Sequence, residues 1–373
     1  MAFDVIVVGA GGLGSAVLYH LARAGATVLG LDRFAPPHDR GSSHGGTRIY
    51  RQAYYEAAEY VPLAVRALEL WRALERDSGT TLFAKTGGLT IGAEDSELVS
   101  GALRSAKLHG ISHETLTASE ASGRFPAFRP PENAIAVFEP TAGVLFPEAC
   151  VSAHLTLARA LGAAVIAGEP AVRVDQLGTR PAVTTNRSTY RAKRVVVAAG
   201  AWAPRLLDAD RLFSVTRETV HWFARATEHA ARGSCPVSMI DSGGGPILYT
   251  IPDFGDGFKA ALHNAGPVAN PDAAADDDTA ASAARVATLL ADVAPGGAGV
   301  LRTSAHCYYT KTPDGHFAIG ALPSAPAILL ASACSGHGFK FTSVLGEAVA
   351  RLALGEEPGL PSTLFDAGRL FLT

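Results

Sequence analysis

The feature that most constrains the fold is a glycine-rich turn at the start of the chain. Residues 3–9 are mostly apolar and β-branched, which predicts a buried strand, and residues 15–24 predict a helix. Between them the glycines Gly9, Gly11 and Gly14 have the spacing Gly-x-Gly-x-x-Gly. The first permits a tight turn, the second lets the backbone approach a pyrophosphate, and the third allows close helix packing.

A carboxylate follows where this motif requires one. A second apolar strand is predicted over residues 26–31, and Asp32 at its end could accept hydrogen bonds from ribose hydroxyls. The phosphates would meet free N–H groups at the positive end of the helix. The sequence therefore predicts a dinucleotide-binding βαβ unit. The motif alone does not separate FAD from NAD, so an NAD-dependent dehydrogenase remains an alternative.

The rest of the chain predicts an α/β protein with a Rossmann-like domain and a discontinuous mixed-sheet (α+β) substrate domain. The first domain gains three apolar strands, predicted at residues 164–167, 194–199 and 328–333. Helices are predicted at residues 59–75, 149–161 and 342–354. We expect this domain to comprise residues 1–80, 146–211 and 305–373. The substrate domain, with shorter alternating strands at residues 87–91 and 247–251, would comprise residues 81–145 and 212–304.

Composition excludes several functional classes. The net charge is −3, which gives no sign of binding to nucleic acid or to an anionic membrane. The four cysteines form no Cys-x-x-Cys pair, so neither a disulfide framework nor a metal site is expected. With no apolar run of spanning length and no signal-peptide pattern, we expect a cytoplasmic protein. The acidic stretch Asp272–Asp278 is expected to be a solvated loop that caps the next helix.

Five further segments of the chain have a distinctive sequence. They are SHGGTRIYRQAYYEAAEYVPLA at residues 43–64, FEPTAGVLFPEAC at 138–150, AAGAW at 198–202, HCYYTKTPDGHF at 306–317 and SGHGFKF at 335–341. In their order and spacing, through nearly the whole chain, they resemble the family of monomeric sarcosine oxidase and N-methyltryptophan oxidase, FAD-dependent amine oxidases of the D-amino acid oxidase superfamily.

The resemblance implies an FAD-binding Rossmann-like domain with the flavin bonded through the sulfur of Cys307 to its 8α-methyl carbon. The alternative for Cys307 is a small buried hydrophobic residue. The turn that holds Gly336 and Gly338 precedes a helix whose N-terminus could stabilise negative charge on the flavin. The implied cofactor-binding residues are Gly9, Gly11, Gly14, Asp32, Arg33, Ser42, Arg48, Cys307, Gly336, Gly338 and Lys340.

The resemblance also implies a set of catalytic residues. Lys259 would lie against the flavin ring and promote reoxidation by O2, because a fixed cation stabilises developing superoxide. A solvated surface charge is the alternative for this lysine. His263 matches the family's active-site histidine, although a structural histidine stays possible. His44 and Arg48 would flank the flavin, with solvated loop residues as the alternative.

Arg51 and Lys340 are the implied carboxylate-binding pair, and Tyr249 would line the substrate side. A carboxylate in a closed pocket needs a compensating cation, and Arg can donate two parallel hydrogen bonds to it. The alternatives are a surface salt bridge for Arg51 and a helix-start charge for Lys340. Leu248 and Tyr308 are expected beside the pocket and differ there from sarcosine oxidase.

The resemblance thus implies an oxidase of a small secondary (N-methyl) amino acid that forms an imine, hydrolysed to aldehyde and amine, and hydrogen peroxide. Its partners would be the amino acid and O2, and the protein would be a monomer. N-methyltryptophan, pipecolate and proline remain alternative substrates. A flavin dehydrogenase with another electron acceptor and a non-catalytic subunit are alternative functions.

Overall fold

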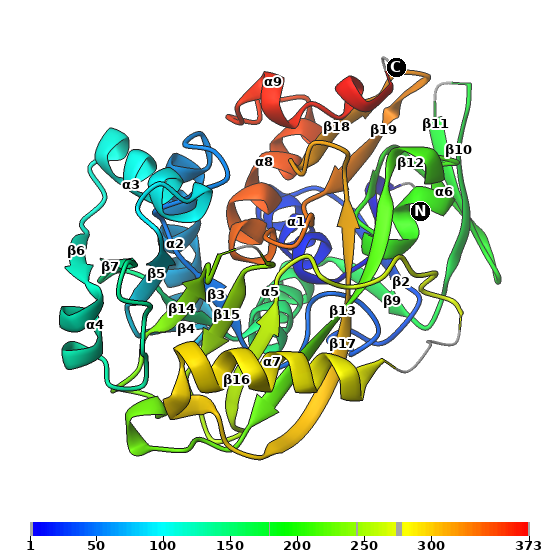
Figure 1. Ribbon diagram of the computed structural model, residues 1–373. Coiled ribbons are helices and arrows are strands. Elements are labelled where there is room, and N and C mark those ends of the chain that lie inside the picture. The colour runs from blue at the N-terminus through cyan, green and yellow to red at the C-terminus, as the bar shows by residue number, and fades with distance from the viewer. Residues whose placement is uncertain (1–2, 179, 244, 274–277, 372–373) are drawn as a thin grey trace.

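Parallel strands form the centre of the first sheet, as the glycine-rich turn predicts. The computed structural model describes residues 3–178, 180–243, 245–273 and 278–371 (Figure 1). The five central strands are parallel, and one antiparallel strand closes an edge. Their order is β18 (Ala318–Leu322), β19 (Ala325–Ser332), β12 (Thr189–Val197), β1 (Phe3–Val8), β2 (Val28–Asp32) and β9 (Ala164–Ala167). A hairpin of β10 (Ala171–Leu177) and β11 (Arg180–Thr185) continues from β12.

The first sheet is buried on both faces because successive side chains of β1 point to opposite sides. Val5 and Val7 pack into one core with the helices, and Ile6 and Val8 pack into another on the opposite face. Near-continuous apolar strands are typical of parallel sheets that are covered on both sides.

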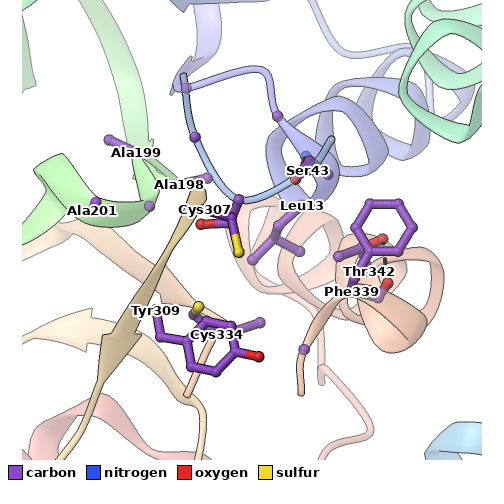
Figure 2. Close-up of a pocket in the computed structure, with 18 of the residues that line it drawn as sticks. Leu13, Ser43, Ala198, Ala199, Ala201, Cys307, Tyr309, Cys334, Phe339 and Thr342 are labelled. Atoms are coloured by element: carbon purple, nitrogen blue, oxygen red, sulfur yellow. Dashed lines mark hydrogen bonds between the residues drawn. The ribbon is translucent and has the colours of Figure 1, made fainter. Parts of the chain in front are cut away.

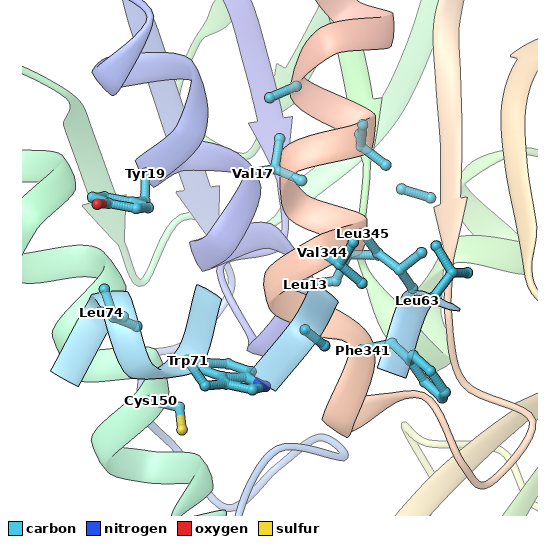
Figure 3. Close-up of a cluster of buried hydrophobic side chains, with 14 of the residues drawn as sticks. Leu13, Val17, Tyr19, Leu63, Trp71, Leu74, Cys150, Phe341, Val344 and Leu345 are labelled. Carbon is cyan, nitrogen blue, oxygen red and sulfur yellow. The ribbon is translucent and has the colours of Figure 1, made fainter. Parts of the chain in front are cut away.

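The helices that cover one face of this sheet begin and end close to their predicted bounds. They are α1 (Gly12–Arg23), α2 (Tyr60–Ser78), α5 (Pro147–Ala160) and α8 (Thr342–Leu354). Figure 3 shows Trp71 of α2 and Val344 and Leu345 of α8, which belong to one shared core. Helix α1 begins three residues before its predicted start, because the glycine-rich turn itself supplies the first helical turn.

The second sheet is mixed, which confirms the predicted fold class. Only β14 and β5 run parallel among its strand pairs that the structure describes. Its strand order is β17 (Leu301–Lys311), β13 (Ser214–Phe223), β16 (Phe258–Leu262), β15 (Leu248–Ile251), β14 (Val237–Ile240), β5 (Gly88–Gly92), β7 (Ile135–Glu139) and β6 (Glu114–Thr117). Strand β17 crosses the expected domain boundary between residues 304 and 305, and the division into domains stays a prediction.

Smaller elements connect the two large sheets. A three-stranded sheet has the order β3 (Arg48–Tyr50), β8 (Gly143–Leu145) and β4 (Phe83–Lys85). The remaining helices are α3 (Glu97–His109), α4 (Ala118–Arg124), α6 (Ala203–Leu206), α7 (Thr279–Val293) and α9 (Ser362–Phe365). Within the described residues, no helix combines the length and the apolar composition needed to cross a membrane.

Helix α7 packs on one face of the second sheet, and strand alternation turns the other face of β16 toward the chain at residues 45–47. Phe258, Ala260 and Leu262 of β16 share a core with α7. Lys259 lies between them in sequence and therefore points to the opposite face. The expected cap of α7 is wrong, because Asp278 at its N-cap makes no side-chain capping bond. Residues 274–277 of that acidic stretch lie outside the described residues.

The contact between Gly14 and the turn before it is a test of this fold. A Cβ atom at Gly14 would lie 1.8 Å from the carbonyl oxygen of Gly9, which is backbone and cannot rotate away. We expect Gly14→Ala to lower the free energy of unfolding by about 1–3 kcal/mol or more, as overpacking does. Urea unfolding of the purified protein measures it.

Gly123→Ala in α4 is the matched control, because a Cβ there meets no atom within 4 Å. It should be neutral or stabilise the protein by up to about 1 kcal/mol through its helix propensity. Equal effects of the two substitutions would contradict the close packing at Gly14.

Candidate active site

A cavity of about 610 Å³ is lined by residues of both large sheets. Most of the residues that sequence analysis singled out line it. They are Gly9, Gly11, Asp32, Arg33, Ser42, Arg48, Arg51, Tyr249, His263, Cys307, Gly336, Gly338 and Lys340. Gly14, His44 and Lys259 are not among the described residues that line the cavity. The structure thus gathers in one cavity residues that are more than 300 positions apart in the chain.

The glycine-rich turn presents an open helix end to this cavity. The N-cap of α1 is Gly11, which has no side chain that could cap the helix. The Gly12 amide donates to Ser43 Oγ at 3.0 Å, which ties the loop after β2 to the turn. Asp32 accepts from the amides of Ala10 at 2.7 Å and Phe34 at 2.8 Å, so it also holds the turn in shape. Free amides at a positive helix end fit a pyrophosphate.

Asp272 reaches this part of the cavity from the segment that follows β16. Its carboxylate is contacted by Arg33 Nη1 at 2.5 Å, Arg205 Nη1 at 3.1 Å and Trp202 Nε1 at 3.0 Å. Asp272 is exposed, as expected of a solvated loop, but three donors from other segments of the chain converge on its carboxylate. All four side chains line the cavity. Sequence analysis missed Asp272, Arg205 and Trp202 because no local pattern pairs them.

Cys307 lies on β17, where it is buried and lines the cavity (Figure 2). Burial raises the pKa of its thiol, and the positive charge of Arg48 opposes that effect. Tyr309 and Cys334 also line the cavity and were not expected there. Cys334 Sγ accepts a hydrogen bond from the Thr310 amide at 3.3 Å, so this second thiol is tied to the strand of Cys307.

Gly336 lies close to the rings of both Tyr309 and His263. Gly336 has a φ of +84°, and a Cβ atom there would lie 2.5 Å from Tyr309 Cε2 and 2.8 Å from His263 Cε1. Only glycine permits this approach. Burial lowers the pKa of His263 to about 4, so its imidazole is neutral at neutral pH.

Tyr249 lines the cavity, as the resemblance implies, but Leu248 and Tyr308 are not among the described residues that line it. Leu248 points to the opposite face of β15 and packs in the core beneath α7. Tyr308 lies against Trp202, with ring centroids 6.3 Å apart, and is not among the described lining residues. The expectation that Leu248 and Tyr308 stand beside the pocket is therefore wrong, because strand alternation sends each away from Tyr249 or Cys307.

Lys259 holds the turn formed by residues 44–47. Its Nζ donates to Gly45 O at 2.7 Å, Thr47 O at 2.9 Å and Thr47 Oγ1 at 3.2 Å. These bonds use all three donors of an ammonium group. Burial lowers the pKa of Lys259, and the charge of Arg48 lowers it further. The side chain is 2% exposed, so the solvated-charge alternative is wrong. Thr47 and Arg48 line the cavity, whereas Lys259 is not among the described residues that do.

The same turn is held from its other side. The carboxylate of Glu148, in the first turn of α5, accepts from the amides of Gly45 at 2.6 Å and Gly46 at 3.0 Å. Arg48 donates to Thr47 O at 2.8 Å and to Ser42 O at 2.9 Å. His44 is buried, and its Nε2 has no hydrogen-bond partner among the described residues. Burial is the main cause that lowers the pKa of His44.

Three charged side chains line the cavity together: Arg51, Glu56 and Lys340. Arg51 Nη2 donates to both carboxylate oxygens of Glu56 at 2.7 Å. Burial would raise the pKa of Glu56, but the charge and hydrogen bonds of Arg51, together with the charges of His337 and Lys340, hold that pKa below its usual range. Glu56 lies within a recognised segment, yet no feature of the sequence identified it as the partner of Arg51.

Lys340 is buried between this ion pair and the turn before α8. Burial lowers the pKa of Lys340 to about 7; the charge of Arg51 adds to this, and Glu56 opposes it. Its Nζ donates to His337 O at 2.8 Å. His337, whose pKa burial lowers to about 3, is neutral at neutral pH. With Lys340 protonated, the cluster holds two positive charges and one negative charge.

Comparison with known proteins agrees with this geometry. The family model of FAD-dependent oxidoreductases matches residues 4–352. The chain is 39% identical to a monomeric sarcosine oxidase of Streptomyces avermitilis, over 99% of this chain and 98% of that protein. It is 33% identical to an N-methyl-L-tryptophan oxidase of Salmonella newport, over 99% of each chain.

Solved structures of similar fold include NikD, an unusual amino acid oxidase, in its open form. It has a TM-score of 0.85 and 25% identity, and the match covers 98% of this chain and 97% of that one. The L-proline dehydrogenase of P. horikoshii has a TM-score of 0.82 at 21% identity, covers 99% and 98%, and supports the fold alone. This chain belongs to the family of FAD-dependent oxidoreductases.

Proposed function

We propose that this protein is a flavin amine oxidase that converts a small secondary (N-methyl) amino acid into an imine and reduces O2 to hydrogen peroxide. The observation that carries the proposal is the excess positive charge of Arg51, Glu56 and Lys340 in the cavity that also holds the dinucleotide motif. The names of the most similar relatives support the same class of substrate.

A substrate carboxylate would balance that charge. Two buried cations share one buried anion, and an unmatched charge in a site with little water is costly. A carboxylate that reaches Arg51 and Lys340 would give two charges of each sign. Because the guanidinium presents donors in a planar fork, Arg51 can contact a second carboxylate beside Glu56. An amino acid anion therefore fits this site better than a simple amine does.

The same cations favour the reactive form of the amine. Positive charge near a secondary ammonium lowers its pKa, because like charges disfavour the protonated form. Arg51 and Lys340, which both line the cavity, would thus promote loss of the amine proton on binding. When bound, FAD would supply the acceptor for the two electrons of the C–N bond and the route by which they reach O2. Water then hydrolyses the imine to an aldehyde and an amine.

Lys259 would act on O2 through its charge. The ammonium is fixed by three acceptors on the turn of residues 45–47, in a site where burial strengthens electrostatic interactions. Arg48 follows that turn directly and lines the cavity. A cation that needs no reorganisation stabilises charge that develops on oxygen.

We further propose a covalent flavin at Cys307, the predicted division into two domains, and a monomer in the cytoplasm.

Arg51→Ala tests the carboxylate site. It removes the bidentate donor and leaves Glu56 as an unpaired buried anion that repels the substrate. The sarcosine concentration for half-maximal anaerobic flavin reduction should rise about 30-fold or more, as expected when a buried charge pair loses one partner. Arg66→Ala, at an exposed guanidinium on α2, should leave it unchanged. An unchanged value in Arg51→Ala would contradict carboxylate binding there.

Cys307→Ala tests the flavin linkage. Acid precipitation of this variant should release the flavin into the supernatant, because no sulfur remains to hold it. The matched control is Cys334→Ala, which removes the second thiol that lines the same cavity. Its flavin should stay with the precipitate, as in the unaltered protein. Flavin retained by precipitated Cys307→Ala would refute the linkage.

Lys259→Met tests the role of the buried cation. Methionine keeps much of the side-chain volume but removes the charge, so reoxidation by O2 should slow by about 100-fold, comparable to the loss of one oxyanion donor. Anaerobic reduction by substrate should slow far less. Stopped-flow absorption measures both half-reactions, with the exposed Lys85→Met as control. If both half-reactions slowed equally, the lysine would have no specific role toward O2.

A further inference from the structure

The two cations of the proposed carboxylate site contact the same buried tyrosine. Arg51 Cζ lies 4.1 Å from the centroid of the Tyr54 ring, and Lys340 Nζ lies 5.2 Å from it. The Tyr54 hydroxyl is also 3.5 Å from Lys340 Nζ. Tyr54 is 0% exposed and is not among the described residues that line the cavity. It therefore lies behind the site and acts on a substrate only through these cations.

The direction of each hydrogen bond around Tyr54 follows from its partners. His337 Nε2 lies 3.1 Å from Gly315 O, which can only accept, so this nitrogen carries the proton. Because the imidazole is neutral, Nδ1 is then an acceptor. The Tyr54 hydroxyl must donate to Nδ1, 2.6 Å away. Its oxygen keeps its lone pairs for an N–H group of Lys340.

Lys340 contacts both residues of this hydrogen-bonded pair, Tyr54 and His337. Its Nζ donates to the carbonyl oxygen of His337 at 2.8 Å and faces the Tyr54 oxygen at 3.5 Å. The lysine carbonyl is fixed as well, because Trp71 Nε1 donates to Lys340 O at 2.9 Å. Both ends of the residue are thus held by groups that carry no charge. The site keeps its excess positive charge, which a carboxylate in place of Tyr54 would cancel.

We propose that Tyr54, oriented by His337, is a positioning residue that keeps Lys340 protonated and aimed at the substrate carboxylate. The inference rests on the proposed function for that carboxylate. It says that Tyr54, which lies outside the cavity, determines how the affinity for the carboxylate depends on pH. Tyr54 stabilises the ammonium by accepting a hydrogen bond. Without its hydroxyl, the ammonium would lose its proton at a lower pH.

Other titratable groups around Lys340 define what must stay constant in a test. Arg51 disfavours its ammonium form, and Glu56 favours it. His263 and His337 interact with it electrostatically but are neutral above about pH 5, since burial lowers their pKa values to about 4 and about 3. Removing only the Tyr54 hydroxyl leaves all four in place. The phenyl ring of Tyr54→Phe also keeps its contact with the Arg51 guanidinium.

Tyr60→Phe is the matched control. Tyr60 packs against Tyr54 with ring centroids 4.8 Å apart and is also fully buried. Its hydroxyl contacts His316 Nδ1 at 3.1 Å instead of His337. The two variants therefore remove the same atom from neighbouring positions of one aromatic cluster. Only Tyr54→Phe removes it from Lys340.

The first readout is the titration of Lys340 itself, by NMR of the holoenzyme labelled with 15N at its lysine side chains. The chain has only six lysines, Lys85, Lys107, Lys193, Lys259, Lys311 and Lys340, so each signal can be assigned by substitution. The second readout is the dissociation constant of butanoate, measured by perturbation of the flavin spectrum. Butanoate carries the carboxylate of sarcosine with a methylene group in place of its amine and cannot be oxidised in the same way.

We expect Tyr54→Phe to lower the pKa of Lys340 and Tyr60→Phe to leave it unchanged. Since the ammonium is present only below its pKa, Tyr54→Phe should weaken butanoate binding about three- to tenfold near pH 7 and have little effect near pH 5.5. A purely structural defect would weaken binding equally at both pH values. Equal pKa values of Lys340 in the native protein and Tyr54→Phe would overturn the inference.

The two readouts separate this inference from the proposed function. If butanoate bound to none of the three proteins while Tyr54→Phe still lowered the pKa of Lys340, the carboxylate site would be wrong and the control of Lys340 by Tyr54 would stand. If butanoate bound to all three proteins with one common pH dependence, the carboxylate site would stand and the role of Tyr54 would be refuted.

Discussion

Positive charge that is withdrawn from water organises one side of the cavity. Lys259, Arg51 and Lys340 are each less than a tenth exposed, yet each finds a different kind of partner. Lys259 is surrounded by the oxygens of a turn, Arg51 by the carboxylate of Glu56, and Lys340 by neutral acceptors. These acceptors favour the protonated form and oppose burial, which lowers the pKa of both lysines. With Lys340 protonated, the site would carry a net positive charge that suits an anion and disfavours a protonated amine.

The fold produces this arrangement because each large sheet contributes a different part of the chemistry. The parallel sheet ends at an uncapped helix N-terminus and Asp32, which suit a dinucleotide. The mixed sheet directs Tyr249 and Cys307 toward the same cavity, and strand alternation buries their neighbours elsewhere. The turn of residues 44–47 is held between Lys259 and Glu148, so its geometry depends on both parts of the molecule. Neither sheet alone forms the site.

Local patterns in the sequence predicted the structural elements that form within short stretches of the chain. The strand at residues 164–167 and the helix at residues 342–354 have the predicted bounds, since both are apolar runs with clear ends. The glycine-rich turn was predicted because its function requires glycine at fixed spacing. The resemblance supplied the site residues in scattered segments, and the structure brings most of them into one cavity.

Pairings between distant residues were not predictable in the same way. Tyr54 contacts His337 across 283 positions, and Arg33 contacts Asp272 across 239. No periodicity or spacing records such a contact, because it arises only when separate elements pack. The partners of Asp272 were not predicted for this reason: an acidic, alanine-rich stretch has the composition of a solvated loop, and its partners lie in another part of the chain.

The most direct test of the central claim is the absorption spectrum of the purified holoenzyme during anaerobic addition of sarcosine, followed by O2. We expect the flavin absorption to bleach with sarcosine, and O2 to restore it with the formation of one hydrogen peroxide per flavin. Bleaching by N-methyltryptophan, pipecolate or proline instead would keep the carboxylate site and change the size of the substrate. If none of these amino acids bleached the flavin, the account of an amine oxidase with a carboxylate site at Arg51 and Lys340 would be contradicted.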